Sequence, residues 1–367
     1  MFYFVYASFY FLLFGILNSL IKGNCKFYFL LYIAIVGFWG LSYTYAPDVY
    51  GYMEYFYKEV RTFSQGIDLS AHGFEVGFNL LASICKSIVP EYIFFQFILF
   101  AIEMALVIVG LKNLLSKQQA RLILVLLFFL FPSMLAATRQ GMSIALIIYA
   151  LQFIENRNWK WYFGLIAIAY TFHHSSLIVV PLYFVTFLLK YLKSNKVLVA
   201  VLLLADLCWI SGLSLSDYLD NALAVFLNDG SEIEKYSIYM NDAETAVSNY
   251  GFAKILEINV AYIGFLYYRK LSGDSNIVLT LFLVLYTVIG LMLGGILAHR
   301  FLYYFIIVYY VCAFIGIHTL LSKSSCSTIF STSYMILAFY MFWFYVLKGD
   351  MMSQEYIFLP LGFRIFI

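Results

Sequence analysis

Long apolar stretches recur from one end of the chain to the other, separated by short polar segments. Each stretch holds about 20 residues, enough for an α-helix to cross the roughly 30 Å hydrocarbon core of a bilayer. The pattern predicts an all-α, polytopic transmembrane bundle of about twelve helices, forming a single domain over residues 1–367. The expected spans are residues 2–21, 27–46, 91–111, 119–137, 138–155, 159–173, 175–191, 196–212, 252–268, 277–297, 299–320 and 329–347.

The short loops predict the orientation of these spans. Lysine and arginine gather around residues 22–26, 112–121, 157–160, 190–196, 269–270 and 323. Because basic short loops are retained in the cytoplasm, these loops face inward and both termini face outward. Phe74–Val89 breaks the alternation, so we expect an interfacial or re-entrant helix there. Pro132 and Pro181 lie inside spans, where a kink is the usual result.

Two outward segments are longer than simple turns. Residues 47–73 mix charged side chains with tyrosine and phenylalanine, which is typical of an amphipathic helix on the membrane surface. Residues 213–251 carry many aspartates and glutamates against a single lysine, Lys235. This acidic loop either lines a saccharide groove or covers the bundle as a solvated cap.

The composition excludes several classes of protein. The chain is 64% hydrophobic and 11% charged, whereas a soluble domain is about 25% charged. A net charge of +2 without a basic cluster argues against nucleic-acid binding. The cysteines lack the spacing of a disulfide framework or zinc site and no Asp-x-Asp clamp occurs, so we expect no metal and no cofactor. The first run, residues 2–21, has no basic n-region or cleavage site and is expected to be retained.

Ionisable groups recur at the predicted outer ends of three spans. They are Arg139 with Gln140, His173 with His174, and His299 with Arg300, the last followed on the same helix face by Tyr303 and Tyr304. Taken singly, an arginine there is often a snorkelling anchor and a histidine a satisfied structural group. A charge in a span costs about 2.5–3.5 kcal/mol, however, and the positive-inside bias removes arginine from the outer side. Because these groups converge at one predicted membrane level, a functional role is favoured over a structural one.

Arginine at that level suits a phosphate ligand. The diphosphate of a polyprenyl lipid lies at this depth, and a guanidinium binds its oxygens through paired hydrogen bonds. Arg139 and Arg300 are thus candidates for a diphosphate site.

Several segments resemble the EpsG branch of the Wzy-type polysaccharide polymerases. The first outward loop, Tyr45–Tyr52, contains an acidic residue among tyrosines, and Glu75-Val76-Gly77-Phe78 resembles the Glu-x-Gly-Phe element of the family. Arg139-Gln140-Gly141-Met142-Ser143 is similar to its Arg-Gln-Gly-x-(Ser/Ala) helix start.

Three further segments extend the resemblance over nearly the whole chain. They are Ala169–Ser175, which matches Ala-x-x-Phe-His-x-Ser; Arg300–Phe305, which matches Arg-x-x-x-Tyr-Phe; and the tail Leu359–Arg364, with Gly-Phe where tyrosine is expected. The match aligns His173 with the family histidine and makes His174 an extra residue. The first loop departs from the pattern, because Tyr43 or Thr44 stands near the place of the usual arginine.

The resemblance implies a GT-C-like glycosyltransferase in the bacterial inner membrane. Such an enzyme uses undecaprenyl-diphosphate oligosaccharides as donor and acceptor on the outer face, without metal, and a chain-length regulator is a further expected partner. His173, Asp48 and Glu75, in that order, are candidates to receive the acceptor proton. A flippase, a membrane acyltransferase and a sugar-chain ligase are alternatives. A flippase should carry charges at the midplane and internal repeats, which the sequence lacks.

The orientation can be tested by cysteine labelling in a variant whose native cysteines are replaced. A cysteine between Ser231 and Asn241 should react with a membrane-impermeant thiol reagent in intact cells. The variant Ser194→Cys should react only after the membrane is permeabilised, because the positive-inside rule places its loop in the cytoplasm. Labelling of position 194 alone in intact cells would invert the topology.

Overall fold

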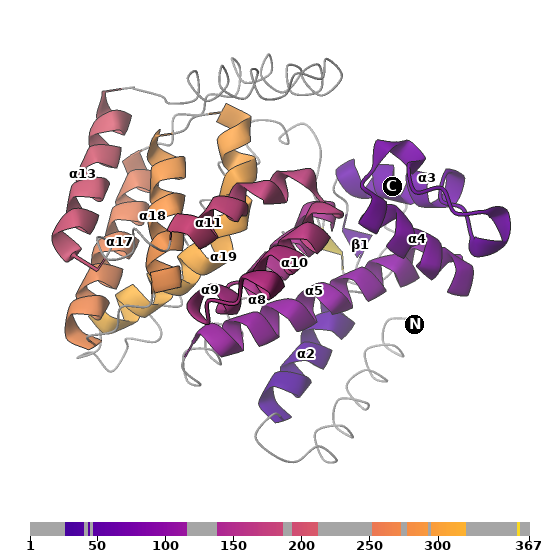
Figure 1. Cartoon of the computed structure of the whole chain (residues 1–367), viewed down its shortest axis with the longest axis horizontal. Coiled ribbons are helices and arrows are strands. Elements are labelled where there is room, and N and C mark those ends of the chain that lie inside the picture. Colours follow the sequence, from indigo (N-terminus) through magenta and orange to yellow (C-terminus); the bar gives the residue numbers. More distant parts are fainter. Residues whose placement is uncertain are drawn as a thin grey trace. The chain divides into compact units, whose positions relative to one another are not determined.

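The computed structural model describes residues 26–39, 43–44, 47–115, 138–185, 193–211, 252–272, 277–292, 295–320 and 358–359, and these are almost entirely helical (Figure 1). The α-helices are α2 (Lys26–Trp39), α3 (Pro47–Lys58), α4 (Val76–Ile88), α5 (Tyr92–Leu114), α8 (Thr138–Ala150), α9 (Gln152–Glu155), α10 (Trp159–Tyr170), α11 (Val180–Val185), α13 (Asn195–Ile210), α17 (Phe252–Ser272), α18 (Ile277–Met292) and α19 (Gly295–Leu320). The 3₁₀ helices in these ranges are η1 (Phe63–Gln65), η2 (Ala71–Gly73) and η3 (His174–Val179). The all-α prediction is confirmed for these residues.

Two short strands complete the described elements. The strands β1 (Tyr43–Thr44) and β2 (Phe358–Leu359) pair antiparallel, with Tyr43 opposite Leu359. The pairing brings the tail next to the segment that precedes the first outward loop. Two parts of the chain that carry the family resemblance, more than 300 residues apart, are therefore neighbours.

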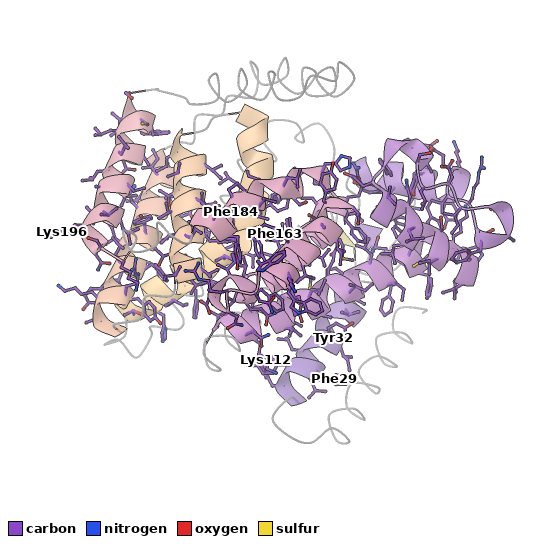
Figure 2. All side chains as sticks on the ribbon, in the orientation of Figure 1. Phe29, Tyr32, Lys112, Phe163, Phe184 and Lys196 are labelled. Carbon is purple, nitrogen blue, oxygen red and sulfur yellow. The ribbon has the colours of Figure 1, made fainter. Side chains whose placement is uncertain are left out.

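The chain divides into two compact units, residues 1–183 with 356–367, and residues 184–355. In the first unit, α5 packs against α2, α4 and α8, and α10 packs on α8. The Tyr32 hydroxyl donates to the Ala101 carbonyl at 3.1 Å, and the Lys112 ammonium lies 5.3 Å from the Tyr28 ring centroid; Figure 2 labels Tyr32 and Lys112. These contacts join α2 to α5.

Close approach of α5 and α8 depends on a glycine. A Cβ added to Gly110 would lie 2.9 Å from the Ile148 carbonyl oxygen, closer than side chains normally come. Small residues are a common means of bringing helices together in membranes, where burial of apolar surface adds little. The contact lies at Ile148, in the last turn of α8, and brings that end of the helix against α5.

The part of the first unit that contains α3 and α4 has an aromatic core. Tyr55, Phe56 and Phe78 are almost completely buried, and Phe95 of α5 packs against the last two rings. The Lys86 ammonium donates to the carbonyls of Phe56, Tyr57 and Val60 at 2.6, 3.1 and 2.9 Å. These carbonyls lie in and just after the last turn of α3, where a helix leaves carbonyls without an N–H partner. Lys86 supplies the donor. This contact explains a lysine in an otherwise apolar helix.

The second unit is built from α13, α17, α18 and α19 (Figure 1). The helix α19 packs along both α17 and α18, and the backbones of α17 and α19 come closest at Gly264 and Gly316. Inside this unit the Tyr309 hydroxyl donates to Glu257 Oε1 at 2.5 Å, and the Tyr309 ring stacks on Tyr286. A buried carboxyl is therefore hydrogen-bonded within the helical bundle.

Two described helices are long and apolar enough to cross a membrane, α5 and residues Leu302–Leu320 of α19. The count of about twelve spans stays a prediction. Three of the expected spans, residues 2–21, 119–137 and 329–347, and the acidic loop 213–251 lie outside the described residues. The expected helix at 74–89 is confirmed as α4, which ends before Pro90.

Elsewhere the helices differ from the predicted spans. The helix α2 is described to Trp39, and Tyr43–Thr44 of the same predicted span form β1. The amphipathic segment is helical in α3 but continues through η1 and η2, which ends at Gly73. The span predicted at 175–191 begins as a 3₁₀ helix. Pro181 then lies in the first turn of α11, a position that needs no backbone N–H donor.

Candidate functional site

Two side chains and one backbone amide from distant segments of the first unit meet at the Glu75 carboxylate. Arg139 donates from Nη1 to Glu75 Oε2 at 2.6 Å. His173 Nδ1 lies 3.0 Å from Glu75 Oε1, and the backbone N–H of His174 donates to the same oxygen at 3.4 Å. The Glu75 side chain is 6% exposed, against 24% for Arg139 and 18% for His173. The carboxylate is therefore the buried centre of a partly open cluster.

Glycine at position 77 allows the start of α4 to reach the segment that carries the histidines. Glu75 is the N-cap residue of α4, in extended conformation. The backbone N–H of Gly77 donates to the Thr171 carbonyl at 2.8 Å, and a Cβ on Gly77 would lie 2.9 Å from that oxygen. The Glu-x-Gly spacing thus combines a carboxylate with a close backbone contact two residues later.

Arg139 is fixed by three groups around its guanidinium. Besides the ion pair with Glu75, its Nε donates to the Tyr52 hydroxyl at 3.2 Å. The Phe74 ring centroid lies 4.2 Å from Cζ, a cation–π contact. Among the described residues none hydrogen-bonds Nη2 of Arg139. These contacts fix the orientation of the guanidinium.

Asn79 organises the turn that delivers Phe74 and Glu75. Its amide nitrogen donates to the carbonyls of Leu69, Ala71 and Phe74 at 2.8, 3.2 and 3.0 Å. Its oxygen accepts from the Tyr55 hydroxyl, and Asn79 itself is 1% exposed. A buried side chain that satisfies several groups of one loop restricts that loop to a single shape.

The histidines follow the end of α10. His173 is extended, with φ −159° and ψ 119°, and its backbone N–H donates to the Ala169 carbonyl at 3.0 Å. With Nδ1 at Glu75, the other ring nitrogen, Nε2, has no hydrogen bond to the described part of the chain. The His174 ring turns away and stacks on Tyr170, with ring centroids 4.6 Å apart. The two adjacent histidines are therefore in different environments.

The electrostatics of the cluster keep Glu75 ionised. Burial alone raises the pKa of Glu75, but the hydrogen bond from His173 and the positive charge of Arg139 outweigh it, and the pKa is lowered to about 2. A carboxyl with so low a pKa is a weak proton acceptor at neutral pH. It orients the Nδ1–H tautomer of His173 and pairs with Arg139 instead.

The structure brings together four of the residues that the sequence singled out: Glu75, Arg139, His173 and His174. Gln140, next to Arg139, is buried. Asp48 lies in the first turn of α3, and its side chain is outside the described part of the structure.

The remaining predicted residues are on α19, in the second unit. His299 and Arg300 lie in its first turns, and their side chains are outside the described part of the structure. Tyr304 is fully buried, whereas Tyr303 is half-buried. Their roles stay predictions.

Sequence reasoning missed Tyr52, Phe74 and Asn79 as neighbours of the site. Tyr52 is the last residue of the first-loop element, and Phe74 directly precedes the Glu-x-Gly-Phe element, so their place in or next to these motifs was the available indication. Nothing in the sequence marks Asn79, because its partners are main-chain carbonyls that only the folded loop presents.

Comparison with known proteins identifies one family. The sequence model of the EpsG family matches residues 25–360, a range that contains every described residue. No curated protein and no solved structure matches the chain.

The low pKa of Glu75 predicts how the stability of the cluster depends on pH. Because the folded pKa is about 2 and an unfolded glutamate titrates near 4.3, the ionised carboxylate stabilises the fold above pH ~4.3. That contribution is lost as the pH falls toward 2. The purified Glu75→Gln protein should melt roughly 3–6 °C below wild type at pH 7, and the difference should shrink by pH 3. A difference that is the same at both pH values would contradict the lowered pKa.

Proposed function

The chain belongs to the EpsG family, and we propose that it is a polysaccharide repeat-unit polymerase of the bacterial inner membrane. In this proposal it transfers a growing glycan from an undecaprenyl-diphosphate donor to a lipid-linked repeat unit on the outer face. Family membership and the apolar helices support a polymerase-like membrane protein. The donor, the acceptor and the face of the membrane belong to the proposal.

The Arg139–Glu75–His173 cluster is the observation that carries the proposal. It places a guanidinium and an imidazole, the two groups that glycosyl transfer from a diphosphate needs, on opposite oxygens of one carboxylate. Arg139 can neutralise charge that develops on the leaving diphosphate. His173 can accept the proton of the attacking hydroxyl.

The proposed step is a single displacement at the anomeric carbon of the donor. The bond from that carbon to the diphosphate oxygen breaks, and the diphosphate leaves with the electron pair toward Arg139. An acceptor hydroxyl forms the new glycosidic bond and gives its proton to Nε2 of His173. Glu75 keeps the other imidazole nitrogen protonated and is a positioning residue, because its low pKa makes it a poor base.

The ion pair between Glu75 and Arg139 has no net charge, so a diphosphate requires a further cation. Arg300 is our candidate for that charge, from its place at the predicted outer end of its span. Asp48 stays a secondary candidate for the base, and His299, Gln140, Tyr303 and Tyr304 are candidates for supporting contacts. No metal or other cofactor is part of the proposal.

Removal of the gene tests the function directly. A deletion strain should carry single repeat units on its acceptor lipid, because a polymerase acts after export and before ligation. Gel electrophoresis of surface polysaccharide, compared with the complemented strain, measures this. Trapping of lipid-linked units inside the cell would support a flippase instead, and undiminished long chains would overturn the polymerase.

Substitution of Arg139 tests whether it holds diphosphate or only stabilises the fold. Lysine keeps the charge but not the planar set of donors, so Arg139→Lys in the deletion strain should shorten chains and Arg139→Ala should abolish them. Loss of a charged hydrogen bond costs about 1.5–3 kcal/mol, or roughly 10–100-fold in rate when felt in the transition state.

The matched control is Arg61→Lys, since Arg61 is exposed and is not among the groups that act on Glu75 or Arg139. Protein levels in the membrane must be equal for all variants. Wild-type chain length in the Arg139→Lys strain at equal protein level would contradict the diphosphate role.

A further inference from the structure

A stacked aromatic pair lies beside the cluster and takes no part in its ion pairs. Tyr170, the last residue of α10, stacks on His174 with ring centroids 4.6 Å apart and an interplanar angle of 26°. Tyr170 is 38% exposed and His174 is also exposed. A stack of this kind leaves the outer face of a ring open to a ligand.

The cluster fixes the position of this stack. The backbone N–H of His174 donates to Glu75 Oε1, the oxygen that also contacts His173 Nδ1. The backbone N–H of His173 binds the carbonyl of Ala169, the residue just before Tyr170. The stack is therefore fixed by the same backbone segment that positions His173, the residue to which we assign the acceptor proton.

We propose that the Tyr170–His174 stack is a platform that binds a sugar ring of the acceptor repeat unit. This inference rests on the polymerase function and names the part of the substrate that the surface takes. The face of an aromatic ring has negative potential, and the apolar face of a pyranose presents C–H hydrogens of the opposite sign. A sugar stacked there would lie beside the short segment that carries His173.

The exposed aromatic residues at the other end of α10 have a different environment. The opposite end of α10 carries Trp159 and Trp161, which are 56% and 61% exposed. Trp161 stacks on Phe153, an apolar ring, as in the aromatic belts at membrane interfaces. Tyr170 instead stacks on the imidazole of His174, whose backbone N–H is bound to the Glu75 carboxylate.

Binding of a phosphate-free oligosaccharide tests the platform. The probe is a single repeat unit obtained by partial acid hydrolysis of the surface polysaccharide of the host, titrated into the purified full-length protein in detergent. Tyr170→Leu should weaken binding by roughly 2–10-fold, the range of an aromatic stacking contact. Tyr170→Phe should restore it, because the ring is retained.

Trp161→Leu is the matched control, since it removes an exposed aromatic ring from the other end of α10 and should leave the affinity unchanged. Three results would each overturn the platform. Tyr170→Leu could bind the probe as tightly as wild type, Tyr170→Leu and Trp161→Leu could weaken binding equally, or wild type could fail to bind the probe. The polymerase proposal is judged separately by chain length in the deletion strain. Long chains there would overturn the polymerase while Tyr170-dependent binding of sugar would still stand.

Discussion

The carboxylate of Glu75 joins segments that lie almost one hundred residues apart, and the shape of the site depends on it. Each oxygen has its own partner, Arg139 on one side and His173 on the other. In a partly buried position, water screens such contacts weakly, so each partner fixes the other through the shared carboxylate. Removal of one group would leave buried charge without compensation, which costs more than the pair contributes when intact.

The rest of the first unit holds this carboxylate in place. Asn79 fixes the loop before it, and Gly77 lets the loop that carries His173 approach to hydrogen-bonding distance. Lys86, at the far end of α4, binds the end of α3, the helix that supplies Tyr52. The segment from α3 to α4 is thus held by polar side chains that bind main-chain carbonyls as well as by its aromatic core.

The sequence singled out the residues of the cluster, but not the contacts that hold them in place. Arg139, Glu75 and His173 could be singled out because charged groups at span ends are costly, and because they occur in short motifs. The periodicity of apolar residues located α4, α5 and α13 to within a few residues. The same periodicity predicted a span that continues past the end of α2, and it did not predict the 3₁₀ helix that begins at His174. Apolar runs do not show where the backbone leaves the α conformation. Phe74 and Asn79 act through contacts that only the tertiary fold creates.

The low pKa of Glu75 and the orientation of His173 have one physical origin. The hydrogen bond that stabilises the ionised carboxylate also keeps the proton on Nδ1, which leaves Nε2 as the basic nitrogen. Arg139 strengthens this effect, because its charge lowers the pKa of Glu75 further. In the proposed reaction, a diphosphate that draws Arg139 toward itself would weaken the ion pair and leave the charge of Glu75 facing His173 alone. Under that proposal, the donor site at Arg139 and the acceptor base at His173 would be coupled through one carboxylate.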